Sequence, residues 1–396
     1  MGIHEPRGAT WVRGAVAVAA IAGCLAACGP ATAGSGAVVV RTPRLADAAV
    51  SSAPRPPTLS VKDGAVVRPG PMTFAAGTGA TVIVTDARGR DVAVVASGGR
   101  FTTAALVPST SYTFVAYTSG GSATATVTTA APARTLTARI WPSGGTFGVG
   151  TPITVTFNHT VINRRAVERR LVVATTKAAA GAWSWASGTR VTFRPTKYWP
   201  AHTGVKVTAN LAGVDAGAGS WGMTAKSAAF AIGRSWVLKV DAKSDQSVLY
   251  QDGKAIRSMG VNTGRPGYET RSGIKLIMEK YAVKRMTNVG VTTSEVYDLQ
   301  VPYAMRLTDT GEFLHAAPWD HNIGYANTSH GCTHLSLANA HWVFDHELEG
   351  DVVQTVGTSR AMETWNGLGG PWNATWATWL RGSLTGLHST GPTSAG

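Results

Sequence analysis

Residues 236–261 read WVLKVDAKSDQSVLYQDGKAIRSMGV and determine the expected fold class of the chain. The runs Trp236–Val240 and Ser247–Tyr250 are rich in the branched and aromatic residues that are typical of strands. Tyr250 is followed by Gln251-Asp252-Gly253-Lys254, which predicts a tight hairpin because Asp-Gly suits a type I′ turn. A further strand is expected over 255–261. The stretch therefore predicts a β-hairpin extended by one more strand.

The same alternation of short strands and turns occurs twice upstream of this stretch. Between residues 58 and 132, runs such as Ala80–Thr85 and Tyr112–Tyr117 are separated by Gly-rich turns, which predicts a small β-sandwich. The pattern restarts over 133–234, where Pro152–Phe157 is a clear strand, and we predict a second sandwich there. The expected fold class is mainly β: two sandwiches followed by a third β unit over 235–356.

The third unit contains the main helix that the sequence predicts. Ser336 is a good N-cap residue, and Gly350 is suited to ending the helix. Four apolar residues recur between them at helical spacing: Leu337, Ala340, Phe344 and Leu348. Residues 357–396 form an extension that carries four tryptophans among Gly and Pro. We expect this extension to fold back on the core and to finish in a disordered end.

The N-terminus has the features of a bacterial export signal. Arg7 and Arg13 form a basic start, and the apolar stretch over 14–27 is too short for a confident membrane span. The sequence Leu25-Ala26-Ala27-Cys28 resembles a lipobox, in which the cysteine is lipidated and becomes the mature N-terminus. An ordinary secretory signal that is cut near Ala26, or after Ala31-Thr32-Ala33, is the alternative.

On the lipoprotein interpretation, residues 1–27 are a signal peptide and Cys28 is the site of lipidation. Residues 28–57 are rich in Ala, Pro and Ser, which is typical of a semi-extended tether. We therefore expect an extracytoplasmic protein, bound to the membrane through a lipid anchor on its outer face and reaching into the cell wall.

The net charge of the chain indicates which classes of partner are expected. The net charge is +14, although only 15% of the residues are charged. A basic surface favours polyanions, which include nucleic acids, anionic lipids and the acidic polymers of a bacterial wall. The sequence has no compact Lys/Arg run and no nucleic-acid-binding motif, so no nucleic acid is expected as a partner.

The cysteine count draws attention to a single thiol. The chain has three cysteines, and Cys24 and Cys28 both fall in the predicted signal and lipidation sites. Cys332 is then the only free thiol of the exported protein, and an intramolecular disulfide framework is impossible. Because an unpaired thiol outside the cell is prone to oxidation, we expect Cys332 to be either buried or used.

The surroundings of Cys332 suggest two kinds of chemistry. Six of the ten histidines lie between residues 315 and 346. His330 and His334 are four residues apart, which would suit a metal, but the sequence has no HExxH motif and no second cysteine nearby. The preferred interpretation is a thiolate nucleophile that a histidine activates, with no metal. His330 is too close in sequence to reach the sulfur easily, whereas His315 is free to return on a neighbouring strand.

Two stretches around these residues carry a family resemblance. His315-Ala316-Ala317-Pro318-Trp319, followed by Asn327-Thr328-Ser329-His330-Gly331-Cys332, resembles the signature of L,D-transpeptidases with a YkuD-type catalytic domain. The resemblance covers residues 235–380. The order of lipoprotein signal, two immunoglobulin-like modules, catalytic domain and Trp-containing tail is similar to that of actinobacterial members of the family.

The resemblance implies a role for each matching residue. Cys332 would be the nucleophile, His315 the general base, and the backbone carbonyl of Ala316 the group that orients the imidazole. The backbone N–H of Cys332 and a neighbouring amide would form the oxyanion hole, next to Gly331. The remaining predicted site residues would line the site or contact the substrate: His330, Tyr297, Ser329, Trp319, His334 and Met286. Of these, Tyr297 is expected in a lid over the donor peptide.

One position departs from the family pattern. The family usually has Asn two residues after the cysteine, whereas this chain has Thr333 and then His334. Either a ring nitrogen of His334 replaces the amide in a hydrogen bond, or the substrate is positioned differently.

The function implied by the resemblance is formation of 3→3 cross-links between peptidoglycan stem peptides, with carbapenems as inhibitors and with no metal or organic cofactor. A histidine-paired thiol is expected to have a lowered pKa. Hydrolysis by an L,D-carboxypeptidase, and a non-catalytic wall-binding lipoprotein, are the alternatives. A papain-like endopeptidase is disfavoured because its cysteine normally precedes its histidine in the sequence.

Overall fold

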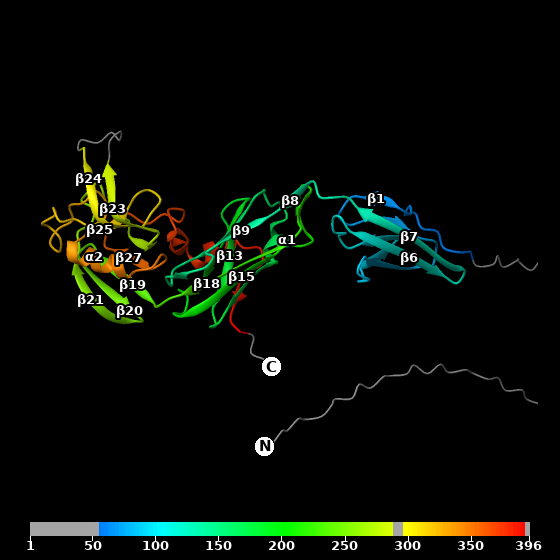
Figure 1. Cartoon of the computed structure of the whole chain (residues 1–396), viewed down its shortest axis with the longest axis horizontal. Helices are drawn as coiled ribbons and strands as arrows, with labels where there is room; N and C mark the ends of the chain where they lie inside the picture. The colour runs from blue at the N-terminus through cyan, green and yellow to red at the C-terminus, as the bar shows by residue number, and fades with distance from the viewer. Residues whose placement is uncertain (1–54, 288–295, 393–396) are drawn as a thin grey trace, which may run out of the picture. The chain divides into compact units, whose positions relative to one another are not determined.

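The computed structural model describes residues 55–287 and 296–392 (Figure 1). The predicted signal peptide, the lipidation site Cys28 and nearly all of the predicted tether lie outside the described residues. In the part of the chain that is described, no helix combines the length and the apolar character needed to cross a membrane.

The first group of strands forms two sheets that share one core. One sheet has the order β1-β7-β6-β3 and the other has the order β2-β5-β4. The strands are β1 (Ala65–Val67), β2 (Thr73–Ala75), β3 (Thr81–Asp86), β4 (Val94–Ser97), β5 (Arg100–Thr103), β6 (Ser111–Thr118) and β7 (Gly121–Thr129). Phe74 of one sheet meets Phe114 of the other edge-to-face, with ring centroids 5.1 Å apart. Both rings are fully buried, so they join the two layers.

The second group contains three sheets around the largest apolar core. Their orders are β10-β18-β15-β12, β28-β13-β14-β11-β9 and β16-β17-β8. The strands are β8 (Arg134–Leu136), β9 (Ala138–Trp141), β10 (Thr146–Phe147), β11 (Ile153–Phe157), β12 (Leu171–Thr175), β13 (Ala180–Trp185), β14 (Arg190–Pro195), β15 (Thr203–Asn210), β16 (Val214–Gly217), β17 (Ser220–Gly222), β18 (Ala225–Ile232) and β28 (His388–Ser389). The burial of β15 alternates residue by residue, as expected for a strand with one face on a core.

The third group consists of a five-stranded and a four-stranded sheet. Their orders are β21-β20-β19-β27-β22 and β23-β24-β25-β26. The strands are β19 (Trp236–Asp241), β20 (Gln246–Gln251), β21 (Lys254–Gly260), β22 (Gly273–Leu276), β23 (Glu279–Thr287), β24 (Asp298–Arg306), β25 (Phe313–Ala316), β26 (Thr333–Leu335) and β27 (Val352–Val356). Asp252 and Gly253 both have positive φ, and Gln251 pairs with Lys254, so the predicted hairpin is confirmed.

Helices are few and short. The main one is α2 (Leu337–His346), which packs on β24 and β25. Ser336 caps it as predicted, because its Oγ accepts a hydrogen bond from the N–H of Asn339. The helix ends at His346 and does not reach Gly350. The other helices are α1 (Arg164–Glu168), the 3₁₀ turn η1 (Gly370–Asn373) and α3 (Trp376–Arg381). The prediction of a mainly β fold with one main helix is confirmed.

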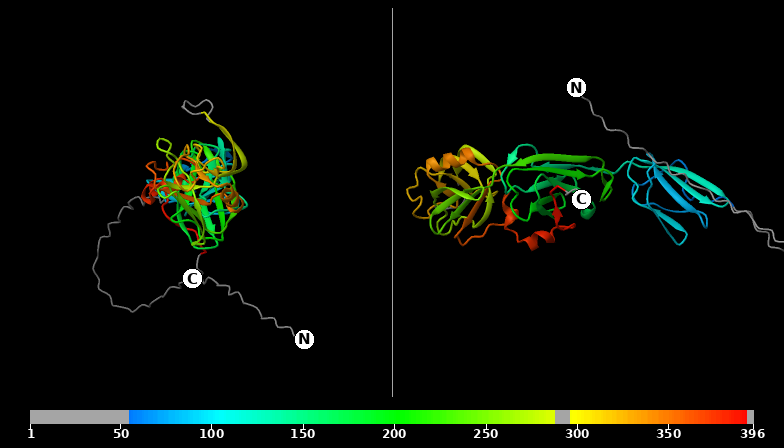
Figure 2. Two further views of the ribbon diagram at one scale, coloured as in Figure 1. Left: turned by 90° about the vertical axis from the view of Figure 1, so that its left-hand side faces the viewer. Right: turned by 90° about the horizontal axis from the view of Figure 1, so that it is seen from below.

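The C-terminal extension packs against the second group of strands (Figure 2). Trp379 of α3 donates from Nε1 to the carbonyl oxygen of Ala182 at 2.9 Å. Further along, His388 and Ser389 form β28, which pairs with β13 at the edge of its sheet. The expectation of a disordered end therefore fails for this part of the chain, whereas residues 393–396 lie outside the described residues. The sequence pattern of β28 is too short to reveal a strand that forms only by pairing.

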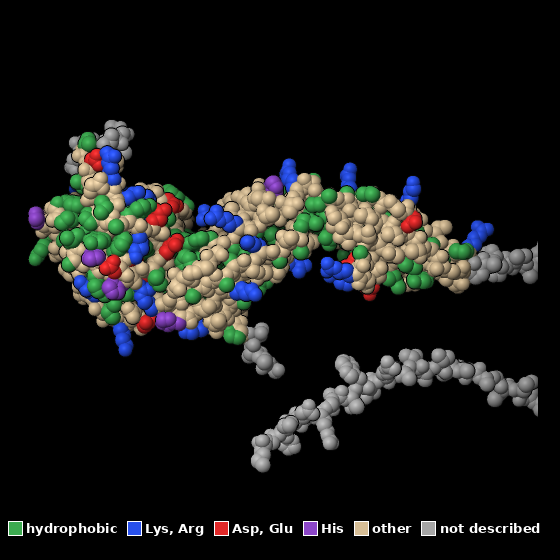
Figure 3. Space-filling model, viewed as in Figure 1, with side chains coloured by type: hydrophobic (Ala, Val, Ile, Leu, Met, Phe, Trp, Pro, Cys, Tyr) green, Lys and Arg blue, Asp and Glu red, His purple; other side chains and the backbone are tan. Residues whose placement is uncertain are grey.

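Basic residues are spread over the face of the molecule that Figure 3 draws. On the face drawn in Figure 3, Lys and Arg side chains stand singly over the strands and do not gather into one patch. The positive charge of the chain therefore acts as a diffuse field on this face and not as a compact docking site.

Candidate active site

The site lies at one end of the four-stranded sheet, where the parallel strands β25 and β26 run side by side. His315 is the third residue of β25, and Cys332 immediately precedes β26. In the register of these strands, Leu314 pairs with Thr333 and His315 pairs with His334. The intervening chain leaves the sheet and returns beside its own starting strand. This return brings the predicted base and the predicted nucleophile to one end of the sheet.

A pocket of about 310 Å³ opens at this end of the sheet. It is lined by eight of the ten predicted catalytic and substrate-binding residues: Met286, Tyr297, His315, Trp319, Ser329, His330, Cys332 and His334. The other two, Ala316 and Gly331, have backbone carbonyls that contact His315 and Thr270. Six further residues also line it: Leu299, Val301, Asp320, His321, Asn322 and Thr328. The pocket thus combines an apolar wall with a ring of histidines.

His315 is buried and held in one orientation. Its Nδ1 lies 2.8 Å from the carbonyl oxygen of Ala316. A carbonyl oxygen only accepts hydrogen bonds, so the proton is on Nδ1 and the lone pair of the neutral ring is on Nε2. Burial lowers the pKa of His315 to about 3, and the neighbouring His334 adds to this effect. The imidazole is therefore neutral at pH 7 and available as a proton acceptor.

The thiol of Cys332 is half-buried and protonated in this state. Its Sγ lies 3.9 Å from the carbonyl oxygen of Gly311. Burial raises the pKa of Cys332 to about 11, and the charge of Glu312 acts in the same direction. The expected lowering of the thiol pKa is therefore wrong for this structure. The cost of burying the thiolate outweighs the opposing effects of a hydrogen bond with the Phe313 backbone and of the positive charge of Lys275.

The Ser329–Cys332 loop is fixed by hydrogen bonds within itself. The hydroxyl of Ser329 donates to the carbonyl oxygen of Cys332 at 2.6 Å and accepts from the N–H of Gly331 at 3.0 Å. Gly331 has a φ of 116°, a conformation that a residue with a Cβ rarely adopts. The glycine is therefore required by the backbone of this loop.

A buried carboxylate, Asp320, joins the loop to His334. Its Oδ2 accepts from Nδ1 of His334 at 2.6 Å and from Nδ2 of Asn262 at 2.6 Å. Asn262, in turn, accepts through Oδ1 from the backbone N–H groups of Thr328 and Ser329. The ring of His334 lies 4.7 Å from that of His315, centroid to centroid. His334 thus makes a polar contact of its own where the family usually has Asn.

Sequence reasoning missed Asp320 and Asn262. The only available signal for Asp320 was its position directly after the His315–Trp319 signature. Asn262 lies far away in the sequence, and it reaches the loop because its backbone bridges to that of His334.

Aromatic rings flank His330 at the mouth of the pocket. The His330 ring lies 5.1 Å from the Tyr268 ring and 5.3 Å from the Tyr297 ring. Burial raises the pKa of Tyr297, so its hydroxyl is neutral at pH 7. Tyr297 lies immediately before β24, next to residues 288–295, which are outside the described part of the chain. Its role in a lid remains a prediction.

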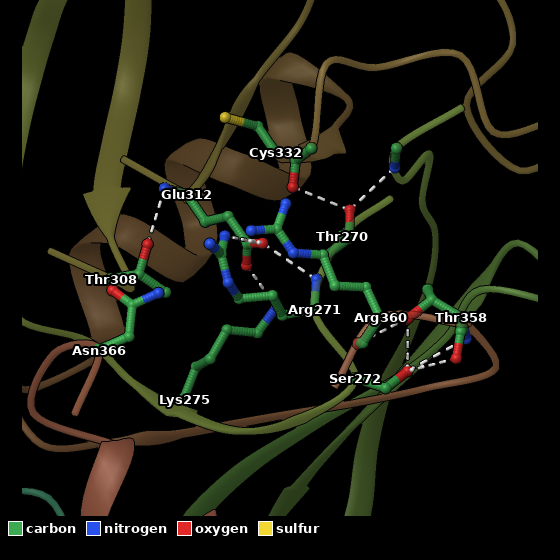
Figure 4. Close-up of polar contacts among 12 residues, drawn as sticks. Thr270, Arg271, Ser272, Lys275, Thr308, Glu312, Cys332, Thr358, Arg360 and Asn366 are labelled. Carbon is green, nitrogen blue, oxygen red and sulfur yellow. Dashed lines mark hydrogen bonds and ion pairs between the residues drawn. The ribbon is translucent and has the colours of Figure 1, made fainter. Parts of the chain in front are cut away.

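A cluster of buried charges lies behind Cys332 (Figure 4). The Lys275 side chain is fully buried, and its Nζ lies 2.9 Å from Oε2 of Glu312. The other carboxylate oxygen of Glu312 accepts from Nη1 of Arg271 at 3.0 Å. Arg271 also pairs with Glu363 at 2.6 Å. Sequence reasoning did not find this cluster, because nothing in the sequence marks these charges as buried.

The comparisons with known proteins agree with this geometry. Residues 235–355 match the model of the L,D-transpeptidase catalytic domain, YkuD, and residues 62–215 match a model of a bacterial Ig domain. The immunoglobulin-like fold expected upstream of the catalytic domain is thereby confirmed. The boundaries at 132/133 and 234/235 remain our proposal.

Relatives with known names point to one family. L,D-transpeptidase 2 of Mycobacterium tuberculosis is 32% identical over 344 residues, which cover 82% of this chain and 84% of the relative. L,D-transpeptidase 5 of the same organism is 33% identical over 262 residues, covering 64% of this chain and 57% of the relative. A solved LD transpeptidase in complex with imipenem aligns with a TM-score of 0.48 and 32% identity, over 57% of this chain and 100% of that one. The chain belongs to the L,D-transpeptidase family.

Proposed function

We propose that this protein forms 3→3 cross-links in peptidoglycan by acyl transfer through a thioester on Cys332. The observation that carries the proposal is the shared pocket of Cys332 and His315, in which Ala316 holds the Nδ1 proton of His315. This contact leaves Nε2 as the basic nitrogen. A buried thiol and an oriented neutral base are the two groups that a cysteine acyltransferase requires.

In the first half-reaction, Nε2 of His315 takes the proton of Cys332 as the sulfur attacks the carbonyl carbon of the third residue of a tetrapeptide stem. Because the thiol pKa is raised and the imidazole pKa is lowered, the neutral pair dominates before attack. Proton transfer is therefore expected to accompany the attack and not to precede it. The terminal D-alanine leaves with the proton, and a thioester remains.

In the second half-reaction, the side-chain amine of a diamino acid in a neighbouring stem attacks the thioester. His315 takes the amine proton, the new amide forms, and the Cys332 thiol is restored. With water as the acceptor, the same site would act as an L,D-carboxypeptidase. The apolar wall of the pocket, formed by residues such as Met286 and Val301, favours retention of the thioester by limiting the access of water.

The proposed function also includes inhibition by carbapenems and a location at the cell membrane. Carbapenems are expected to acylate Cys332, because opening of their lactam requires the same thiol, base and oxyanion donors. We also propose that the protein is lipid-anchored through Cys28 on the outer face of the cell membrane. That location brings the catalytic domain to the peptidoglycan stems.

The test is incubation of the purified protein with a disaccharide-tetrapeptide, followed by mass spectrometry of the products. A dimer that has lost one D-alanine supports transpeptidation, whereas the monomer shortened by one residue as the sole product supports a carboxypeptidase. If neither product forms, and no carbapenem adduct appears on Cys332, the non-catalytic wall-binding function is favoured. Cys332→Ala is the control and should form none of these products.

A further inference from the structure

The residues beneath the Cys332 peptide belong neither to the family signature nor to the pocket lining. Thr270 is fully buried and lies outside the pocket lining. Its hydroxyl accepts a hydrogen bond from the N–H of Gly264 at 2.8 Å. Its own proton is then available to the carbonyl oxygen of Gly331, 2.8 Å away. Figure 4 shows Thr270 next to Cys332, on the side opposite the sulfur.

The hydrogen bond from Thr270 also determines the direction of the Cys332 N–H. The carbonyl of Gly331 and the N–H of Cys332 belong to one peptide unit, which is planar and trans, so that the two groups point in opposite directions. With the carbonyl held on Thr270, the N–H of Cys332 points away from Thr270. The backbone of Gly331, with its φ of 116°, allows this orientation.

Thr270 is itself held by the buried charges. The backbone N–H of the next residue, Arg271, donates to Oε1 of Glu312 at 2.9 Å, and its guanidinium contacts the same oxygen. The N–H of Glu312 donates to Thr308. The carboxylate of Glu312 thus fixes the Thr270–Arg271 segment against the start of β25. Glu312 also follows Gly311, whose carbonyl oxygen faces the Cys332 sulfur.

We propose that Thr270, anchored through Arg271 and Glu312, is a positioning residue that aims the Cys332 N–H at the oxyanion formed during acyl transfer. The inference rests on the proposed acyl transfer and deepens it. Thr270 touches neither the substrate nor the sulfur. Its contribution is expected only in steps that develop negative charge on a carbonyl oxygen.

The test compares two reactions of the same thiol in the full chain. With p-nitrophenyl acetate, the sulfur attacks the ester carbonyl, an oxyanion forms, the C–O bond breaks and p-nitrophenolate leaves, so that Cys332 carries an acetyl thioester. With iodoacetamide, the sulfur displaces iodide from carbon, and no oxyanion forms. Peptide mapping measures the label on Cys332 separately from Cys24 and Cys28, and Cys332→Ala gives the background.

Thr270→Val, which keeps the shape but removes the hydroxyl, is expected to lower the ratio of the acetylation rate to the alkylation rate about tenfold or more. Its alkylation rate, and the pH dependence of that rate, should match the wild type. Thr270→Ser should restore the ratio. Glu312→Gln is a second route to the same readout. Loss of its negative charge should raise both rates by lowering the pKa of Cys332, while the ratio should fall less than in Thr270→Val, since the amide oxygen still accepts from the Arg271 N–H.

The outcomes separate this inference from the proposed function. If the ratio is unchanged in both Thr270→Val and Glu312→Gln, the positioning role is wrong. If acetylation and alkylation fall together, the residues act on the thiol or on folding, and the inference is also wrong. If the wild type is acetylated with the expected dependence on Thr270 but forms no cross-link from a tetrapeptide, the cross-linking function fails while the positioning role stands.

Discussion

Two buried glutamates hold different parts of this molecule, and they do so with different partners. Glu168 of α1 is fully buried under the C-terminal extension. Among the described residues it accepts only from neutral groups, which include the Trp185 indole at 2.7 Å and the Ser383 hydroxyl at 2.7 Å. Glu312 lies behind the Cys332 thiol and accepts from the cations Lys275 and Arg271.

The difference reflects what each carboxylate holds in place. Glu168 gathers the backbone N–H groups of Leu384 and Thr385, and thereby docks the end of the chain onto the second group of strands. Glu312 holds Lys275, whose positive charge lowers the pKa of Cys332, while the charge of Glu312 itself raises that pKa. The neutral donors around Glu168 are enough to hold a segment in place. The buried cations around Glu312 also change the electric field at neighbouring groups, but their burial requires the desolvation of several charges.

Removal of the Glu312 carboxylate should have the largest effect on stability. Glu312→Leu leaves Lys275 and Arg271 buried with one partner fewer, and the expected loss is about 3–5 kcal/mol in the free energy of unfolding. Urea denaturation measures this loss. The double variant Lys275→Met/Glu312→Leu should recover part of it, because fewer unpaired charges remain. A loss below about 1 kcal/mol in the single variant would show that the cluster is solvated.

The pH dependence of thiol reactivity tests the electrostatics of the same region. The pKa of Cys332 is about 11 because the thiol is buried. Its thiolate fraction, and hence its alkylation rate by iodoacetamide, should rise about tenfold per pH unit between pH 7 and 9. The urea-unfolded chain should level off near the ordinary thiol pKa. A plateau of the folded protein below pH 8 would instead indicate a preformed thiolate.

Replacement of Glu168 should lower the free energy of unfolding less than replacement of Glu312 does. It should leave the reactivity of the Cys332 thiol unchanged. Glu168→Leu removes the acceptor of several neutral donors, and we expect a loss of about 2 kcal/mol together with easier proteolysis after α3. The alkylation rate of Cys332 should not change. Asp345→Asn, a surface change in α2, is the matched control for urea denaturation and limited proteolysis. A slower Cys332 reaction in Glu168→Leu would mean that the docked extension supports the active site.

The smallest effect on acylation and stability is expected for the replacement of Ala316. Its backbone carbonyl holds His315, while its side chain is fully buried among apolar residues. Ala316→Ser keeps the carbonyl, so the rate of Cys332 acylation should stay within about twofold of the wild type, although the buried hydroxyl should cost about 1 kcal/mol of stability. A large loss of acylation at unchanged stability would mean that the side chain, and not the carbonyl, matters.

Local signals in the sequence were enough to predict several elements. The Asp252-Gly253 hairpin and the Ser336 cap depend on short-range chemistry, and both are present in the structure. Cys332 and His315 were found because the chain has one thiol outside the predicted signal and lipidation sites and a recognisable signature around both residues. That they share a pocket follows from the pairing of β25 and β26, which the sequence only suggested.

The features that the sequence did not predict depend on contacts between distant segments. The burial of Lys275 and Glu312 arises where β22 lies near the start of β25, and a charged residue gives no sign in the sequence that it will be buried. The raised pKa of Cys332 follows from the same burial. The short strand of the C-terminal extension forms only against β13, and Asp320 becomes part of the site through Asn262 and His334.

The most direct test of the central claim is the intact mass of the protein after brief exposure to a disaccharide-tetrapeptide donor without an acceptor, followed by peptide mapping. Our account predicts a covalent adduct of the donor less one D-alanine, attached to Cys332 and absent from Cys332→Ala. Failure to trap any adduct under conditions in which the donor is consumed, or an adduct on a different residue, would contradict it.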